Sequence, residues 1–294
     1  MTEVEIQLPT RGPFSLRELA LFGFGHRAES DFDGVMRLAF CLDDDFATPV
    51  AAAVTQSGEE LSVRFQGVDD DAGVEAAAAQ VARVLSVDHD GLAFLEVGRR
   101  DPVIGRLQAV APGLRPPLFY SPYEAAVWSV LSFRRPRAQG IRLREALNAA
   151  HGTTFDVAGR ATSALPTPTA LLEVDRLPGL PADRIPRLHA VAQAALEGRL
   201  SVPHLTALTP EEAMAEVQEL PGIGPFYSAL IVIRACGLAD VLALGEPRAR
   251  ELVGELYGIA GPLDDRRYAE LAEQWRPFRT WATVLIRAAA GRLP

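Results

Sequence analysis

The sequence of 294 residues contains no lysine, and all 29 of its basic residues are arginines. Schiff-base chemistry through a lysine side chain is therefore excluded. Cysteine is nearly as scarce, because Cys41 and Cys236 are the only two, far apart and in apolar contexts. We expect both to be reduced core thiols, and two cysteines cannot supply the four ligands of an iron–sulfur cluster.

Long hydrophobic runs are missing as well. No apolar run reaches 18 residues, the usual length for a membrane-spanning helix. The N-terminal stretch MTEVEIQLPTR lacks a basic segment followed by an apolar one, so it is not typical of a signal peptide. These absences predict a cytoplasmic protein with no membrane partner. Nothing in the sequence points beyond a monomer, and the five histidines have no metal-ligand spacing.

Negative charge is concentrated in the first third of the chain. The formal net charge is −9, and residues 1–100 hold 18 acidic residues against eight arginines. An acidic balance of this kind does not favour nucleic-acid binding. Residues 101–294 are close to neutral, with 20 acidic residues and 21 arginines, so they are free to carry local basic patches.

Alternating and apolar segments in the first third predict an antiparallel sheet with helices. Segment 35–43 reads as a strand, and 49–67 reads as two strands around a turn at 57–59. The alanine-rich segment 73–87 predicts a helix, and 14–24 a second, shorter one. We therefore expect an N-terminal α+β domain over residues 1–90.

From about residue 91 onward the pattern becomes helical. Ser121-Pro122-Tyr123-Glu124 and Thr209-Pro210-Glu211-Glu212 both match a capping box with proline at the first helical position. Glycines follow several apolar helical segments, as expected where helices end. The prediction is a two-lobed all-α core over residues 91–294, and the fold class of the whole chain is α+β.

The stretch LPGIGP, residues 220–225, lies between two helical segments and carries two glycines and two prolines. Gly222 and Gly224 allow a sharp turn and the close approach of another backbone. The second helix, which starts at Pro225, presents free N–H groups and the positive end of its dipole, which suits a phosphate group. An ordinary corner between helices is the alternative, and the related LPGLP at 177–181, which lacks the second glycine, is more typical of that.

Residues 219–251, ELPGIGPFYSALIVIRACGLADVLALGEPRARE, resemble the helix-hairpin-helix DNA glycosylase superfamily, and most of all the bacterial 3-methyladenine DNA glycosylases. Segment 113–140 is similar to the stretch that leads to the family's strand-wedging loop, and 273–288 to its last helix. The resemblance covers nearly the whole chain. It implies a nucleoid-associated, monofunctional glycosylase that flips alkylated purines out of duplex DNA containing damaged bases and excises them.

The resemblance also implies which residues act. Glu246 falls where the family has a catalytic aspartate, which stabilises the positive charge that develops on the sugar. A surface charge at a helix end is the alternative for this residue. The implied DNA contacts lie in the hairpin and in the wedge loop, where Phe133 is otherwise a core residue at a helix end. They are Gly222, Ile223, Gly224, Ser228, Phe133, Arg134 and Arg137.

The base pocket implied by the resemblance is aromatic, although an aromatic residue is more often part of a core than of a pocket. Its members are Phe22, Tyr120, Phe226, Tyr227, Trp281 and Arg287. Arg287 stands where a close relative carries tryptophan, and its charge disfavours a cationic base and favours neutral or bulky lesions. Phe226 occupies the position of the lysine in bifunctional relatives, so a lyase step by that route is excluded.

The resemblance requires no cofactor. It allows a structural monovalent cation at the hairpin, held by the carbonyl groups of Gln218, Leu220 and Ile223. The departures from the family at the carboxylate and at the wedge leave a second function open. This alternative is a non-catalytic helix-hairpin-helix protein that recognises DNA lesions or bent DNA.

Overall fold

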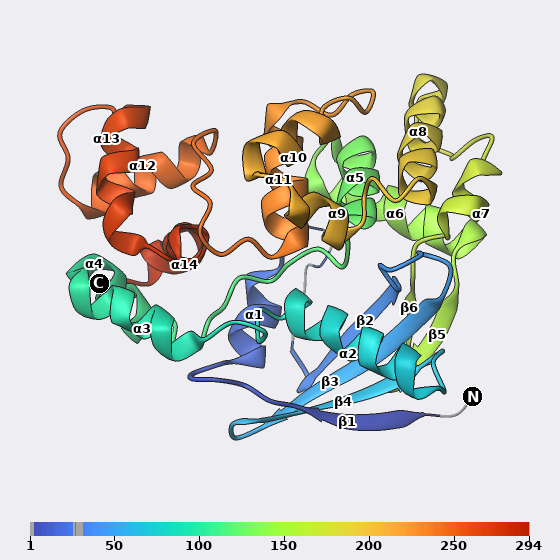
Figure 1. The fold of residues 1–294 in the computed structure, drawn as a ribbon, viewed down its shortest axis with the longest axis horizontal. Coiled ribbons are helices and arrows are strands. Elements are labelled where there is room, and N and C mark those ends of the chain that lie inside the picture. The colour runs from blue at the N-terminus through green and yellow to red at the C-terminus, as the bar shows by residue number, and fades with distance from the viewer. Residues whose placement is uncertain (1–2, 26, 28–31, 294) are drawn as a thin grey trace.

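The computed structural model describes residues 3–25, 27 and 32–293. Three bodies make up the molecule: a sheet with its helices, and two helical lobes (Figure 1). The sheet is antiparallel with the strand order β1-β4-β3-β2. Its strands are β1 (Val4–Leu8), β2 (Val35–Cys41), β3 (Pro49–Ser57) and β4 (Glu60–Gln66).

The predicted pair of strands around residues 57–59 is confirmed. Strands β3 and β4 pair from Ala51 opposite Gln66 to Ser57 opposite Glu60, so the turn closes at the tip of the pair. Helices α1 (Leu16–Phe22) and α2 (Asp71–Val84) pack on the apolar face of the sheet. Burying these alternate apolar side chains is the main force that holds a helix on a sheet.

The first helical lobe is built around α5 (Pro122–Ser132), every residue of which is buried. Ser121 caps this helix by accepting from the N–H of Glu124, but the Glu124 side chain does not close the predicted box. It pairs instead with Arg144, 2.9 Å away inside the lobe. The remaining helices are α6 (Arg137–His151), α7 (Pro168–Leu172), α8 (Ile185–Leu196), α9 (Val202–Ala207), α10 (Pro210–Val217) and α11 (Pro225–Cys236), with the 3-10 turn η1 (Ala182–Arg184) before α8.

The second helical lobe joins segments that are far apart in the chain. Its members are α3 (Gly91–Arg100), α4 (Pro102–Val110), α12 (Pro247–Leu256), α13 (Asp265–Ala272) and α14 (Arg279–Ala289), with the 3-10 turns η2 (Glu273–Trp275) and η3 (Ala290–Arg292). Trp275 is fully buried in this core and donates from Nε1 to Asp101, which caps α4, at 2.9 Å. Within the part of the chain that the structure describes, none of the helices has both the length and the apolar character needed to cross a bilayer.

The prediction that residues 91–294 are all-α is wrong. Strands β5 (Thr154–Val157) and β6 (Arg160–Ser163) form a hairpin within this region. Phe155 and Val157 alternate with polar residues, and both are buried against Ala39 and Ala51 on the face of the sheet opposite α2. The small side chains of the sheet leave that face open, and the hairpin covers part of it (Figure 1). The predicted domain boundary near residue 90 stays a prediction.

Candidate DNA interface and active site

The turn between α10 and α11 lies at the surface of the first lobe. Ile223 is only 5% exposed and packs into the core, so the turn is anchored by one side chain. Gly222 has φ of 89°, a left-handed conformation that favours glycine. Gly224 has φ of −99°, which any residue adopts, and among the described atoms nothing lies within 4 Å of a Cβ added there. The predicted exposed elbow is therefore present in the structure.

Helix α11 begins without a side-chain cap in the described part of the chain. Pro225 at its first position has no N–H, and the N–H of Ser228 donates to the carbonyl of Gly224 at 3.0 Å. The N–H groups of Phe226 and Tyr227 lie between them, and no acceptor for either is found among the described residues. Two free donors at the positive end of a helix form the arrangement that binds anions.

The predicted wedge loop lies beside this helix. The Phe133 ring is 6.2 Å from that of Tyr227, and Tyr227 is 5.3 Å from Phe226, measured between centroids. Phe226 is 50% exposed, and Arg134 is exposed with φ of 54°, a conformation that is unfavourable for a residue other than glycine. The structure thus brings the wedge loop and the hairpin, about 90 residues apart in sequence, to one surface.

Two other predicted DNA contacts are placed differently. Arg137 is exposed, but its guanidinium donates to the carbonyls of Gly25 at 2.8 Å and Arg27 at 2.5 Å. It therefore fastens the segment after α1 to the start of α6. Ser228 is fully buried and its hydroxyl donates to the carbonyl of Pro225, so it stabilises the first turn of α11. Contacts of these two residues with DNA stay predictions.

Glu246 stands at the start of α12, where it is the N-cap residue. Its side chain is 23% exposed and meets Arg287 of α14, whose Nη1 donates to both carboxylate oxygens at 2.8 and 2.5 Å. The predicted catalytic acid and the predicted pocket arginine are therefore in direct contact. At 23% exposure the carboxylate stays partly accessible, as its expected role demands.

A third charged residue, Arg234 of α11, belongs to the same region, and the sequence analysis missed it. Its guanidinium lies 3.8 Å from the centroid of the Phe24 ring and donates from Nη2 to the carbonyl of Pro117 at 2.5 Å. Burial lowers the pKa of Arg234 to about 9; the charges of Arg27 and Arg287 lower it too, whereas the charge of Glu246 raises it. The sequence feature that could have pointed to Arg234 is its position as the single charged residue in the apolar run ALIVIRAC.

The predicted pocket residues do not all gather around Glu246. Trp281 is 2% exposed and packs in the second lobe against Phe94, at 5.2 Å between ring centroids. Tyr120 is 3% exposed and packs in the sheet core against Phe40, at 5.4 Å. Phe22 is half-buried against the core of the second lobe. Trp281 and Tyr120 are thus core side chains in this structure, and their pocket role stays a prediction.

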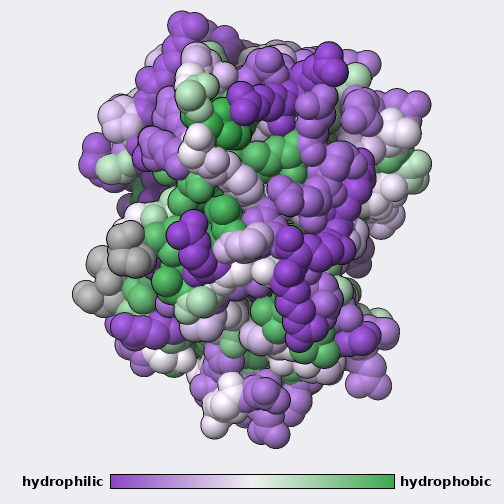
Figure 2. Space-filling view, turned by 90° about the vertical axis from the view of Figure 1, so that its left-hand side faces the viewer, coloured by the Kyte–Doolittle hydropathy of each residue, from purple (hydrophilic) through white to green (hydrophobic). Residues whose placement is uncertain are grey.

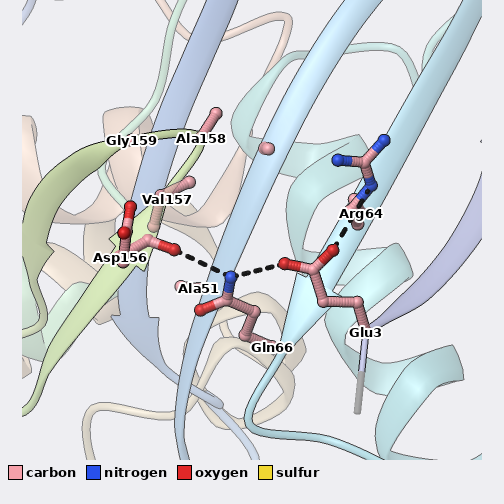
Figure 3. Close-up of a pocket in the computed structure, with 9 residues that line it drawn as sticks. Glu3, Ala51, Arg64, Gln66, Asp156, Val157, Ala158 and Gly159 are labelled. Carbon is pink, nitrogen blue, oxygen red and sulfur yellow. Dashed lines mark hydrogen bonds and ion pairs between the residues drawn. The ribbon is translucent and has the colours of Figure 1, made fainter. Parts of the chain in front are cut away.

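Two cavities lie elsewhere, and Glu246 lines neither. One of about 450 Å³ lies between the sheet and the β5–β6 hairpin, over Ala51 and Ala53. Figure 3 shows Gln66 in this cavity, where its side-chain amide donates to the carbonyl of Asp156 and to a carboxylate oxygen of Glu3. The other, of about 90 Å³, lies beside Trp281 in the second lobe.

The face of the molecule on the side of the second lobe also carries apolar area. Figure 2 views the molecule from the side of α13, α14 and α4, and hydrophobic residues form a band from its upper centre to its left edge. Hydrophilic residues cover most of the rest of this face. An exposed apolar band of this kind marks a surface that a ligand or partner can cover.

The predicted cation site would use main-chain carbonyls at the end of α10. The carbonyl of Leu220 accepts from the N–H of Ile223 at 3.1 Å. Among the described residues, no cluster of three or more His, Cys, Asp or Glu side chains could hold a metal ion. The monovalent cation stays a prediction.

Comparison with known proteins finds relatives in sequence, whereas no family model matches the chain. The chain is 30% identical over 195 residues to the Escherichia coli DNA-3-methyladenine glycosylase 2. This match covers 65% of this chain and 66% of that protein. The chain is 26% identical over 291 residues to a Mycobacterium tuberculosis protein named probable bifunctional transcriptional activator/DNA repair enzyme AlkA. That match covers 95% of this chain and 56% of the relative, so the chain spans little more than half of its length.

The fold is shared with a solved structure. The 3-methyladenine DNA glycosylase from Archaeoglobus fulgidus superposes with a TM-score of 0.76 at 18% identity, over 96% of each chain. Together with the hairpin at α11, these likenesses show that the chain belongs to the helix-hairpin-helix DNA glycosylase superfamily. Within that superfamily it is similar to the bacterial 3-methyladenine DNA glycosylases II, as the resemblance in sequence predicted.

Proposed function

We propose that the protein is a monofunctional DNA glycosylase that flips damaged purines out of duplex DNA and hydrolyses their N-glycosidic bonds. The observation that carries the proposal is the carboxylate of Glu246, partly exposed at the start of α12, in a chain whose hairpin helix α11 opens with two free N–H groups. The carboxylate suits a developing sugar cation, and the N–H groups suit a phosphate of the DNA strand.

The chemistry needs few groups. The N-glycosidic bond breaks with its electron pair leaving on the base, and positive charge develops at C1′ and the ring oxygen of the sugar. The Glu246 carboxylate stabilises this charge. A water oxygen then bonds to C1′ and its proton passes to the carboxylate. Phe133, partly buried beside Tyr227, fills the space that the flipped nucleotide leaves in the stack.

The positive charge of Arg287 affects which damaged base is excised. Its guanidinium adds positive charge beside Glu246, and Arg234 adds more from α11. A cationic N-alkylated purine is repelled by these charges, whereas a neutral purine gains from them as negative charge develops on the leaving base. Among alkylated purines we therefore expect neutral ones, such as 1,N6-ethenoadenine, to be preferred over 7-methylguanine.

A lyase step is not expected. Lysine is absent from the chain, and Phe226, half exposed at the first turn of α11, stands where bifunctional relatives carry one. The protein should therefore leave abasic sites without cutting the strand. The proposed partner is double-stranded DNA with damaged bases, bound by a monomer.

The test is base release from duplexes that each carry one lesion: 3-methyladenine, 7-methylguanine, 1,N6-ethenoadenine or hypoxanthine. We expect free base and abasic sites from at least one of them, with strand breaks only after alkali or an endonuclease is added. Release from none of the four contradicts the proposal.

The contact between Arg287 and Glu246 favours a second candidate, a non-catalytic protein that recognises lesions or bent DNA. The single Nη1 group occupies both carboxylate oxygens, which leaves less of the carboxylate for a sugar cation. This function predicts tighter binding to lesion-bearing duplex with no base release under single-turnover conditions. Those conditions remove slow product release as the reason for inactivity.

A further inference from the structure

Four arginines gather beside the hairpin, and the likeness to the glycosylases does not account for them. Arg184 and Arg187 follow the LPGLP turn at the start of α8, and Arg134 and Arg135 belong to the wedge loop. Two of them meet at one aromatic ring: the guanidinium carbon of Arg184 lies 4.8 Å from the centroid of Phe133, and that of Arg134 lies 5.2 Å from it. Such stacking holds guanidinium groups in fixed positions.

Arg187 extends this cluster to the hairpin itself. A Cβ added at Gly222 would lie 2.6 Å from Nη1 of Arg187, so the arginine side chain rests directly against the turn. Gly222 is therefore needed for two reasons, its left-handed backbone and the room it leaves for this side chain. The free N–H groups of α11 and the Arg187 guanidinium consequently belong to one surface.

The charges of the cluster are poorly balanced within the protein. Arg187 and Arg184 share the carboxylate of Asp183, at 3.6 Å and 3.8 Å, and the Asp183 side chain is 67% exposed. Burial lowers the pKa of Arg184, and so do the charges of Arg187, Arg135 and Arg134, while Asp183 acts in the opposite direction. Guanidinium groups held close together at this cost are the usual mark of a site for phosphate.

We propose that Arg184 and Arg187 form a second phosphate site, which binds the DNA backbone next to the phosphate held by the hairpin. This inference rests on the proposed function, because it takes the bound polyanion to be duplex DNA. The site explains how a chain of net charge −9 holds DNA: the positive charge is local, and it flanks the main-chain donors. It also gives the LPGLP turn a role, since that turn delivers the arginines to the hairpin.

The test measures the affinity for an undamaged duplex by fluorescence anisotropy at several salt concentrations. A plot of log K against log salt has a negative slope, and each lost phosphate contact reduces its magnitude by about 0.9. We expect the magnitude of the slope to be smaller by about 1 to 2 in Arg184→Gln/Arg187→Gln. Arg187→Gln alone should lower it by about 1, which covers the case in which the double variant fails to fold. Arg187→Lys should keep the wild-type slope because it keeps the charge.

The matched control is Arg99→Gln/Arg266→Gln, which removes the same net charge. Both of these side chains are exposed helical arginines of the second lobe, and each is paired with a glutamate on its own helix. The control should keep the wild-type slope. An unchanged slope in the α8 variants, or an equal loss in the control, overturns the second phosphate site. Wild-type protein without salt-dependent DNA binding would instead overturn the proposed function.

Discussion

Arg287 and Glu246, 41 residues apart in the chain, form an ion pair in which one guanidinium nitrogen donates to both carboxylate oxygens. The pair joins the last long helix, α14, to the start of α12. It couples two properties of the proposed active site, because the residue that positions the carboxylate also brings positive charge toward the base. Changing Arg287 should therefore alter the choice of lesion as well as the rate.

Arg287→Gln tests that coupling. Removing the guanidinium removes repulsion from a cationic base, and the Arg287 side chain is 42% exposed, so solvent weakens the effect. We expect the ratio of 7-methylguanine to 1,N6-ethenoadenine release to rise roughly 10-fold, measured as single-turnover rates on the two duplexes. Arg248→Gln, which changes an exposed arginine paired with Glu251 on α12, should leave the ratio as it is. A ratio that does not move in Arg287→Gln would show that this charge does not select the base.

Gly224→Ala separates a folding role of the hairpin glycine from a DNA-binding role. The backbone there suits any residue and the space around it is open among the described atoms, so the free energy of unfolding should change little. A methyl group on this surface keeps a phosphate from approaching the N–H groups of α11. We expect affinity for duplex DNA to fall on the order of 10-fold, or about 1.4 kcal/mol.

The control for this change is Gly254→Ala, inside α12. A Cβ there also meets open space among the described residues, and alanine in a helix interior is more stable than glycine by about 0.5 to 1 kcal/mol. This variant should gain stability and keep the wild-type affinity. Equal affinity in both glycine variants would mean that the elbow does not touch the strand.

Arg115 should prove essential to stability. It is 1% exposed and donates to five main-chain carbonyls, which join the N-terminal segment to the link before α3. The acceptors are Pro13, Ser86, His89, Arg11 and Gly12. A lysine has three donors in place of five, so Arg115→Lys leaves buried carbonyls unsatisfied.

We expect Arg115→Lys to lower the free energy of unfolding by roughly 3 kcal/mol in urea titrations. Arg106→Lys, at an exposed position of α4, should stay within about 0.5 kcal/mol of the wild type. A change in Arg115→Lys as small as in this control would show that the five hydrogen bonds add little to stability.

The two thiols should be inert in the folded protein. Burial raises the pKa of Cys236 to about 12, and burial together with the charges of Glu124 and Asp45 raises that of Cys41 still further. At pH 8 iodoacetamide should therefore modify neither thiol until the chain is unfolded, as read by mass spectrometry. Rapid labelling of either one in the native protein would contradict the structure.

The same shifts fix the sign of a pH dependence. An unfolded thiol ionises near its ordinary pKa of 9.0, whereas the folded one keeps its proton. The stability that the protonated thiols provide is complete below pH 9 and is lost as the pH rises toward the folded pKa. The free energy of unfolding of the wild type should thus fall more steeply above pH 9 than that of Cys41→Ala/Cys236→Ala.

Local features of the fold were predictable from the sequence. The turn at 57–59 and the capping box of Thr209 and Glu212 depend on residues within four positions of each other, and both are present as expected. The hairpin between α10 and α11 belongs to this group as well. In each case the backbone preferences of a few neighbouring residues decide the structure.

Other features depend on distant partners and could not be predicted. The Glu124 side chain does not close the predicted capping box with Ser121, because it pairs with Arg144, 20 residues away, whose buried charge needs a counter-charge. The β5–β6 hairpin is stable because the small residues of the sheet leave a face for Phe155 to cover. In the candidate site, the sequence names the carboxylate of Glu246 and the hairpin as candidates, but the contact of Arg187 with Gly222 appears only when α8 is packed against the turn.

The most direct test of the account is the single-turnover release of base by Glu246→Gln, compared with the wild type on the lesion that the wild type excises best. Glutamine keeps the size of the side chain and removes the negative charge that stabilises the sugar cation. We predict a rate at least about 100-fold lower, with affinity for the lesion-bearing duplex retained. Base release by Glu246→Gln at the wild-type rate would contradict the assignment of Glu246 as the catalytic carboxylate.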